Sequence, residues 1–322
     1  MNILVTGAAG FIGFHLCKKL LNDKYKVFGI DNINNYYDVN LKKNRLKQLL
    51  TKKNFKFKKI DISNENFVKN IYPSVKNCKI IIHLAAQAGV RYSISHPYKY
   101  IESNVKAQIS ILELAKKIKK FNRLIYASSS SVYGFNKKTP FSIEDRVDNP
   151  ASLYGATKRS GELISQSYSK MFGIKCTALR FFSVYGPWGR PDMAAYIFTK
   201  NLFENKPLDI FNFGRMERDF TFVSDIVSGI VPIIKLKDSS LHSIYNLGNN
   251  KPEPLLKLVN ILETLCGKKA KIKKKNMQLG DVRKTYANIN QSKKDLKFKP
   301  KTNLKDGLKE FVDWYREYHK IN

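Results

Sequence analysis

Short apolar runs alternate with longer amphipathic segments through the first 180 residues of the chain. The apolar runs have the length of β-strands and lie at residues 2–5, 26–30, 55–60, 80–84, 123–128 and 175–180. Between them the pattern predicts helices, notably over residues 99–119 and 153–172. Strands that alternate with helices build a parallel sheet covered on both faces, which binds ligands at the carboxyl ends of its strands. The pattern therefore predicts a Rossmann-type, doubly wound α/β fold.

A glycine-rich turn follows the first apolar run. Gly7, Gly10 and Gly13 stand at three-residue spacing before a helical pattern. Glycines at this place permit a tight turn and let the backbone approach a pyrophosphate at a helix N-terminus, where free N–H groups favour anions. Asp31 ends the next strand and can accept hydrogen bonds from ribose hydroxyls, while it would repel a 2′-phosphate. No Arg or Lys follows it immediately, so the turn predicts NAD rather than NADP.

The alternation breaks beyond residue 183. Segments rich in Gly and Pro, at 186–191 and 249–254, interrupt shorter strands and helices, and a last helix is expected over 304–319 after Thr302 and Asn303. We therefore expect an NAD-binding domain with the catalytic residues at 1–183. A smaller α/β substrate-binding domain is expected at 184–322, with some segments returning to the main domain.

Tyr154 and Lys158 are the candidate catalytic pair. Residues four apart on a helix lie on one face, so the ammonium of Lys158 can sit beside the phenol of Tyr154. A neighbouring cation favours the phenolate and lowers its pKa. A phenol made acidic beside a dinucleotide site can take a proton from a sugar hydroxyl, although the same pair also occurs as an ordinary helix contact.

Composition adds one unusual feature, a formal net charge of +32 over 322 residues. The lysines are spread over helix exteriors, with one dense run at 268–275, and no nucleic-acid-binding signature accompanies them. We therefore expect a solvated basic surface rather than a nucleic-acid site. Four scattered cysteines fit reduced thiols in a cytoplasmic protein, and we expect neither a metal site nor membrane insertion.

Several motifs recur in one order along the chain: the glycine turn, the serine run before Val132-Tyr133-Gly134, Tyr154-x-x-x-Lys158 and Arg180-Phe181-Phe182. Together they resemble the extended short-chain dehydrogenase/reductase family of nucleotide-sugar enzymes. Within it, the strings at 83–93 and 181–194 look like the UDP-glucuronate 4-epimerases. The chain departs from that group at Ser183, usually Thr, at Glu217 and at Arg283, often Pro.

The resemblance implies a site in three parts. The catalytic residues are Tyr154, Lys158 and Ser129, which bridges the sugar 4-hydroxyl and the tyrosine. The NAD site comprises Gly7, Gly10, Phe11, Ile12, Gly13, Asp31, Asn32, Asp61, Ile62, Leu84, Ala85, Ala86, Gln87, Tyr154, Lys158 and Phe181. The UDP-sugar site comprises Arg91, Ser129, Ser130, Ser183, Arg190, Arg218 and Asp281.

The implied reaction transfers hydride from C4 of the sugar to NAD, turns the 4-keto sugar over about its diphosphate, and returns hydride to the opposite face. Arg218 is the implied diphosphate clamp and Asp281 the ribose contact. Ser183 and Arg190 would hold the glucuronate carboxylate out of line for decarboxylation. The resemblance also implies a homodimer through helices near 99–119 and 153–172.

Two alternatives stay open. A 4-epimerase of neutral UDP-hexoses, UDP-glucose or UDP-N-acetylglucosamine, differs only in the carboxylate clamp. A non-catalytic NAD-binding regulator would be expected to lose the Tyr–Lys pair, which this chain keeps.

Overall fold

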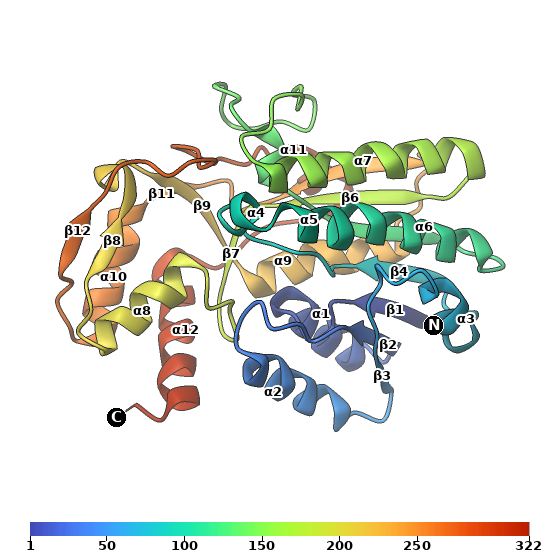
Figure 1. Cartoon of the computed structure of the whole chain (residues 1–322), viewed down its shortest axis with the longest axis horizontal. Coiled ribbons are helices and arrows are strands. Elements are labelled where there is room, and N and C mark those ends of the chain that lie inside the picture. The colour runs from blue at the N-terminus through green and yellow to red at the C-terminus, as the bar shows by residue number, and fades with distance from the viewer. Residues whose placement is uncertain (322) are drawn as a thin grey trace.

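A seven-stranded parallel sheet runs through the main body of the protein, whose computed structural model describes residues 1–321. The strand order is β3-β2-β1-β4-β5-β6-β10, so the chain winds outward from β1 in both directions (Figure 1). The strands are β1 (Asn2–Thr6), β2 (Lys26–Asp31), β3 (Phe55–Lys59), β4 (Ile80–His83), β5 (Arg123–Ser129), β6 (Cys176–Phe181) and β10 (His242–Leu247). This order confirms the predicted doubly wound Rossmann-type fold, with a switch point between β1 and β4.

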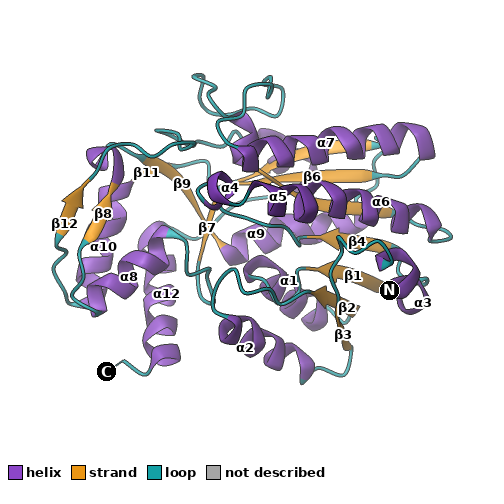
Figure 2. Cartoon of the chain, viewed as in Figure 1, coloured by secondary structure: helices purple, strands orange, loops and turns teal. Residues whose placement is uncertain are grey.

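Helices cover both faces of the sheet (Figure 2). Alternate residues of β1 point to opposite faces: Ile3 and Val5 belong to one apolar core, and Leu4 belongs to another. The first core is closed by α1 (Phe11–Asn22), α2 (Val39–Leu50) and α9 (Val223–Ile230). The second is closed by α3 (Phe67–Val75) and α6 (Ala107–Lys117), with α7 (Leu153–Phe172) packed against it. This continuous burial on two faces explains why the strands read as unbroken apolar runs.

The helix predicted over 99–119 is present but contains a π-helical stretch. After α4 (Tyr92–Ser95), the chain forms α5 (Pro97–Tyr100), the π-helical segment η1 (Ile101–Lys106) and then α6. Asn104 in the wide π turn is buried, and its amide bonds the backbone N–H of Gln87 at 2.8 Å, the carbonyl of Gln87 at 3.0 Å and the hydroxyl of Thr157 at 3.0 Å. The wide turn thus lets one polar side chain hold the loop after β4.

The second half of the chain builds a smaller α/β layer beside the sheet. A three-stranded sheet has the order β11-β9-β7 and a two-stranded sheet joins β12 to β8. Its strands and helices are β7 (Ser183–Tyr185), α8 (Ala194–Phe203), β8 (Leu208–Ile210), β9 (Glu217–Phe222), β11 (Pro252–Pro254), α10 (Leu255–Cys266), β12 (Ile272–Lys274) and α12 (Leu304–His319). The helix α11 (Asn290–Leu296) instead packs against β10 of the main sheet. Short 3₁₀ segments are η2 (Ser130–Tyr133), η3 (Phe211–Gly214) and η4 (Val231–Lys235).

The last helix begins as the sequence predicts. The side chain of Asn303 accepts a hydrogen bond from the N–H of Asp306 and caps α12. The division of the chain at residue 183 stays a prediction. β10 pairs with β6 in the main sheet and α9 packs on α1, so segments beyond residue 183 do return to the main body.

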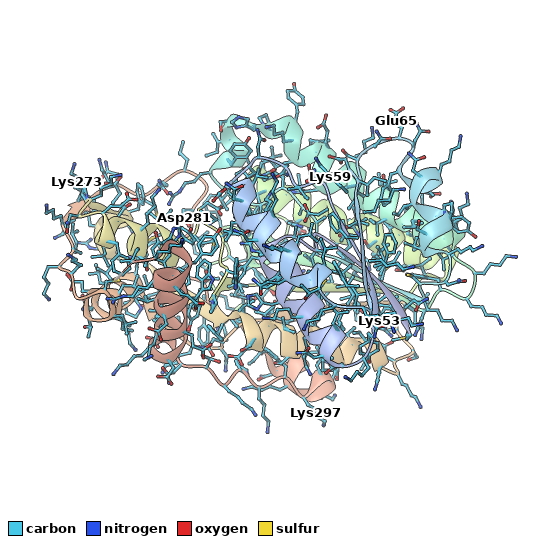
Figure 3. The ribbon with its side chains drawn as sticks, turned by 90° about the horizontal axis from the view of Figure 1, so that it is seen from below. Lys53, Lys59, Glu65, Lys273, Asp281 and Lys297 are labelled. Carbon is cyan, nitrogen blue, oxygen red and sulfur yellow. The ribbon has the colours of Figure 1, made fainter. Side chains whose placement is uncertain are left out.

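The positive charge is distributed around the molecule. Lys53, Lys273 and Lys297 are exposed and lie in well-separated parts of the molecule, as Figure 3 shows. Over residues 1–321, no helix is both long and apolar enough to cross a membrane. Within the same range, no cluster of three or more His, Cys, Asp or Glu side chains could hold a metal ion.

Candidate functional site

A cavity of about 840 Å³ opens at the carboxyl ends of the central strands and brings together every site residue predicted from the sequence. Its lining includes the glycine turn after β1, Asp31 after β2, the loop after β4, the serine run after β5 and the start of α7. From the second half of the chain it includes Ser183, Arg190, Arg218 and Asp281. Gly7 and Asp281, which are 274 positions apart, thus converge on one site.

The turn between β1 and α1 requires glycine for space as well as for conformation. Gly7 has φ +69°, and a Cβ at Gly13 would lie 2.0 Å from the carbonyl oxygen of Gly7. The N–H of Gly10 donates to that same carbonyl at 2.9 Å. These contacts press the turn against the start of α1, whose free N–H groups face the cavity as a pyrophosphate cradle requires. The residues present therefore fit a dinucleotide.

Asp31 is almost fully buried at the end of β2. Its carboxylate accepts hydrogen bonds from the N–H of Ala9 at 3.1 Å and the N–H of Ile33 at 2.8 Å. Burial raises its pKa, while the two N–H groups and the ammonium of Lys42 oppose that rise. Lys42 lies eleven positions beyond Asp31, donates to the carbonyl and side chain of Asn34 at 2.7 and 2.6 Å, and lines the cavity. The sequence analysis did not predict this lysine as a site residue, because only the path of the loop after β2 and the first turn of α2 bring it to the cavity.

Tyr154 and Lys158 occupy the first turns of α7. The helix begins at Ser152, whose side chain accepts from the N–H of Gly155 at 3.1 Å. The ammonium of Lys158 donates to the carbonyl of Ala127 at 3.0 Å, and burial lowers its pKa to about 8. Burial raises the pKa of Tyr154, and the guanidinium of Arg190 and the hydroxyl of Ser129 oppose the rise. The expected influence of Lys158 on the phenol stays a prediction, since its ammonium is engaged with β5.

His83, the last residue of β4, is a buried core residue. Its Nδ1 is 2.7 Å from the hydroxyl of Thr6, and the side chain is 4% exposed. Burial, with a smaller contribution from the nearby charge of Lys158, lowers its pKa to about 3. It is neutral at physiological pH and serves packing and orientation rather than proton transfer.

Two arginines from the second half of the chain reach the cavity already paired with carboxylates. Arg190 donates through Nε to Asp192 at 3.0 Å and also contacts it through a second nitrogen, while the hydroxyl of Tyr36 donates to the same carboxylate at 3.0 Å. Arg218 donates to Asp281 at 2.7 Å and to the carbonyl of Arg283 at 3.1 Å. The pairs hold both guanidinium groups in fixed positions beside the site.

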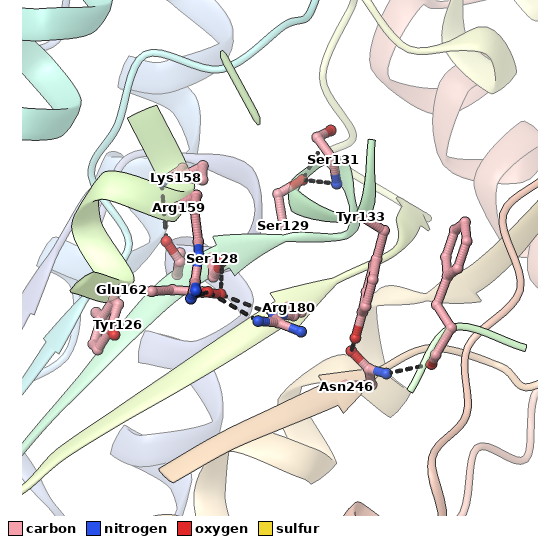
Figure 4. Close-up of polar contacts among 12 residues, drawn as sticks. Tyr126, Ser128, Ser129, Ser131, Tyr133, Lys158, Arg159, Glu162, Arg180 and Asn246 are labelled. Atoms are coloured by element: carbon pink, nitrogen blue, oxygen red, sulfur yellow. Dashed lines mark hydrogen bonds and ion pairs between the residues drawn. The ribbon is translucent and has the colours of Figure 1, made fainter. Parts of the chain in front are cut away.

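The sequence missed Tyr36 and Asp192, which line the cavity beside Arg190. Asp192 stands two positions after Arg190, a spacing that could have been read as an ion pair. Tyr36 is 156 positions from Asp192, and no local sequence motif predicts the contact between them. A further missed group is Glu162, one turn beyond Lys158, which lies outside the cavity and joins α7 to the ends of β5 and β6 (Figure 4).

A family model described as "NAD dependent epimerase/dehydratase family" matches residues 3–248 of the chain. This match covers the glycine turn, the Tyr–Lys pair and the ends of all seven strands of the main sheet. The chain belongs to this family. It is an enzyme of the isomerase class, with NAD as its cofactor.

Individual relatives and solved structures resemble the chain over almost its whole length. UDP-glucuronate 4-epimerase 2 of Arabidopsis thaliana is 43% identical over 337 residues, which cover 99% of this chain and 77% of the plant protein. The structure of UDP-glucuronic acid 4-epimerase from Bacillus cereus, in complex with UDP-glucuronic acid and NAD, superposes with a TM-score of 0.92 at 36% identity, covering 99% of this chain and 100% of that one. A UDP-glucose 4-epimerase from Thermotoga maritima superposes with a TM-score of 0.89 at 30% identity, covering 99% and 100% of the two chains.

Proposed function

We propose that this NAD-dependent UDP-sugar 4-epimerase acts on UDP-glucuronate and converts it to UDP-galacturonate. The observation that carries the proposal is the position of Arg190, a guanidinium in the same cavity as Tyr154 and Ser129 and close enough to influence the phenol. A cation at this place suits a sugar whose C6 is a carboxylate. The relatives from Arabidopsis and Bacillus cereus, both named for this substrate, support the choice.

The side chains of the cavity divide the work. Tyr154 takes the proton of the sugar 4-hydroxyl and returns it to the same oxygen after the sugar has turned, with Ser129 bridging the two oxygens. Arg218 holds the diphosphate and Asp281 the uridine ribose, so that the nucleotide stays fixed while the sugar turns. The glycine turn and Asp31 hold NAD, which accepts the C4 hydrogen as hydride and gives it back. The net redox change is zero.

Glucuronate adds a requirement that neutral sugars lack. Oxidation at C4 gives a β-keto acid, which loses carbon dioxide when its carboxylate bond aligns with the carbonyl π system. Ser183, at the start of β7, and Arg190 would hold the carboxylate out of that alignment. Asp192 already binds the Nε edge of Arg190, so the carboxylate would meet the remaining N–H groups of the guanidinium.

The alternative is a 4-epimerase of neutral UDP-hexoses. The pairing of Arg190 with Asp192 favours this alternative, because the pair as a whole carries no net charge. The resemblance to the Thermotoga maritima enzyme, named for UDP-glucose, points the same way.

The test compares kcat/KM for UDP-glucuronate and UDP-glucose in the wild type and in Arg190→Gln. Both substrates lose the effect of Arg190 on Tyr154, and only UDP-glucuronate also loses a charge-assisted contact with its carboxylate. The variant should therefore lower kcat/KM for UDP-glucuronate about 10- to 100-fold more than kcat/KM for UDP-glucose. Arg146→Gln, at an arginine whose side chain is 93% exposed, is the matched control. A wild type that prefers UDP-glucose would replace the proposal with the neutral-sugar alternative, and bound NAD without any turnover would favour a regulator.

We also propose a cytoplasmic homodimer. All four cysteines are buried free thiols, which suits a reducing compartment. The helices α6 and α7 pack side by side, and exposed apolar side chains on and beside them include Ile101, Ile109, Leu163 and Met171. A second copy covering these side chains would remove them from water. Size-exclusion chromatography with light scattering measures the assembly directly.

A further inference from the structure

The end of β5 lacks a strand neighbour on one side. The pairing of β4 with β5 stops at His83 and Tyr126, whereas the pairing of β5 with β6 continues to Ser129 and Phe181. Residues 127–129 therefore project beyond β4 and have a ladder of hydrogen bonds to β6 alone. Ser129 lies at the tip of this projecting end, so its position depends on what else holds these residues.

Helix α7 supplies the missing support through two side chains. Lys158 donates to the carbonyl of Ala127 at 3.0 Å, and Glu162 accepts from the hydroxyl of Ser128 at 2.6 Å. Tyr154, Lys158 and Glu162 follow each other at four-residue spacing and so share one face of the helix. The face that presents the phenol to the cavity is thus also the face that grips the end of β5.

Glu162 is itself held rigidly from several sides (Figure 4). Its carboxylate receives Nε and a terminal nitrogen of Arg180, both at 2.9 Å, and a terminal nitrogen of Arg159 at 3.1 Å. Burial alone would raise the pKa of Glu162, but these arginines and Ser128 lower it below its ordinary value, so the group is a carboxylate at neutral pH. A buried charge satisfied by two-point pairing fixes geometry more strictly than a neutral contact does.

The same network also reaches the turn after Ser129. Arg180 is the registered partner of Ser128 on β6, and its guanidinium lies 4.9 Å from the ring centre of Tyr133. Tyr133 ends the short helix η2, which begins with the side chain of Ser129 accepting from the N–H of Ser131 at 3.1 Å. Ser129 therefore lies between two segments that contact the Glu162–Arg180 pair. Ser128 before it bonds Glu162, and Tyr133 of the η2 turn after it contacts Arg180.

We propose that Glu162 is a positioning residue for the epimerase reaction, which holds the end of β5 through Ser128 and thereby fixes Ser129 against Tyr154. The inference rests on the proposed function in that it takes Ser129 and Tyr154 as partners at the reacting hydroxyl. Glu162 touches neither substrate nor cofactor, since it lies behind the cavity wall with a fully buried side chain.

A double-mutant cycle tests the proposal. Ser128→Ala removes the link from Glu162 to the strand and leaves the Glu162–Arg180 ion pair intact. We expect it to lower kcat about 10- to 100-fold with KM within about 3-fold, because a small misplacement of a reacting group is costly. If Glu162 acts through Ser129, the double variant Ser128→Ala/Ser129→Ala should be no slower than Ser129→Ala alone. Multiplying effects would overturn the proposal.

The dependence of kcat/KM on pH is a second measurement, whose pKa values a general loss of folded protein would not shift. The hydroxyl of Ser129 is one of the groups that lower the pKa of Tyr154, so its misplacement should shift the acid limb of the kcat/KM profile to higher pH. Glu162→Gln should show the same shift if it folds. An unshifted acid limb in Ser128→Ala would count against the proposal.

Glu113→Gln is the matched control. Glu113 on α6 also holds α7, because it accepts from the hydroxyl of Tyr168 at 2.9 Å, but it does so far from the cavity. We expect this variant to keep kcat within about 2-fold of the wild type. An equal loss in Glu113→Gln and Ser128→Ala would mean that any loosening of α7 slows the enzyme, and would overturn a specific role for Glu162.

A crystal structure of Ser128→Ala separates this inference from the proposed function. Displacement of the Ser129 hydroxyl relative to Tyr154 is the expected result, whatever substrate the wild type uses. An unchanged end of β5 would overturn the inference even if the enzyme epimerises UDP-glucuronate. Conversely, a wild type without epimerase activity would refute the proposed function and leave the displacement measurable.

Discussion

At the scale of single residues, burial shifts the pKa values of the groups around the reacting hydroxyl. It lowers the pKa of Lys158 to about 8 and raises that of Tyr154. For Tyr154, groups outside its helix oppose the rise in pKa, and the strongest of them is the guanidinium of Arg190. The acidity of the Tyr154 phenol therefore depends on Arg190, a side chain that we propose for the substrate site.

His83 gives a pH dependence of stability whose sign follows from its environment. Its folded-state pKa of about 3 lies below the ordinary value of 6.5, so its contribution to stability is present above pH 6.5 and is lost as the pH falls toward 3. As the pH falls from about 7.5 to about 5, we expect protonation of His83 to lower the free energy of unfolding by about 2 kcal/mol. Urea unfolding of the wild type and His83→Gln measures it. Equal losses in both proteins would show that His83 does not carry the effect.

Residues of the candidate site could be predicted from the sequence where they belong to a short local motif. The glycine turn, Asp31 and the Tyr154–Lys158 spacing each rest on one strand, one turn or one helix face, and all lie in the cavity. The hydrogen bond of Tyr36 to Asp192 joins residues 156 positions apart and has no local signature. Glu162 had a local signature, its spacing from Lys158, but its partners on β5 and β6 become visible only when the strands are in register.

At the scale of elements, the turn between β1 and α1 is the least tolerant segment of the cofactor site. A Cβ at Gly13 would meet the carbonyl carbon of Gly7 at 2.8 Å and its oxygen at 2.0 Å, both backbone atoms that cannot rotate away. Gly13→Ala should therefore weaken NAD binding at least about 10-fold by moving the turn. Gly173→Ala is a comparison at a C-cap with no atoms within 4 Å, where only φ +66° is strained. Fluorescence titration with NAD measures both, and unchanged affinity in Gly13→Ala would contradict the steric argument.

Helices could be predicted from the sequence where a single helical repeat of buried positions ran along the whole segment. α7 runs over Leu153–Phe172 and α12 over Leu304–His319, as expected. α12 keeps one apolar face from cap to cap, and α7 buries a periodic face of small and polar residues such as Gly161, Glu162 and Ser165. The segment 99–119 keeps its apolar pattern but contains a π-helical stretch, because Asn104 is drawn inward to bond the loop after β4. A hydrogen-bond demand from outside the helix thus altered a geometry that the sequence pattern alone left regular.

At the scale of the whole molecule, the net charge of +32 acts on any anionic substrate. A UDP-sugar carries its diphosphate charge, and exposed lysines such as Lys53, Lys273 and Lys297 lie in well-separated parts of the molecule (Figure 3). We expect kcat/KM to fall several-fold between about 0.02 M and about 0.3 M salt, while kcat changes less than about 2-fold, because screening slows encounter and not chemistry. Steady-state kinetics at several salt concentrations measure this. A kcat/KM that is insensitive to salt would show that the charge serves another purpose.

The central claim is that this chain inverts C4 of UDP-glucuronate with Tyr154 as the proton-transfer group. The most direct measurement is NMR of the purified protein incubated with UDP-glucuronate, beside Tyr154→Phe. The account predicts the appearance of UDP-galacturonate with the wild type and a rate at least about 100-fold lower with the variant, which should still bind NAD. Release of carbon dioxide and a UDP-pentose, or undiminished turnover by Tyr154→Phe, would contradict it.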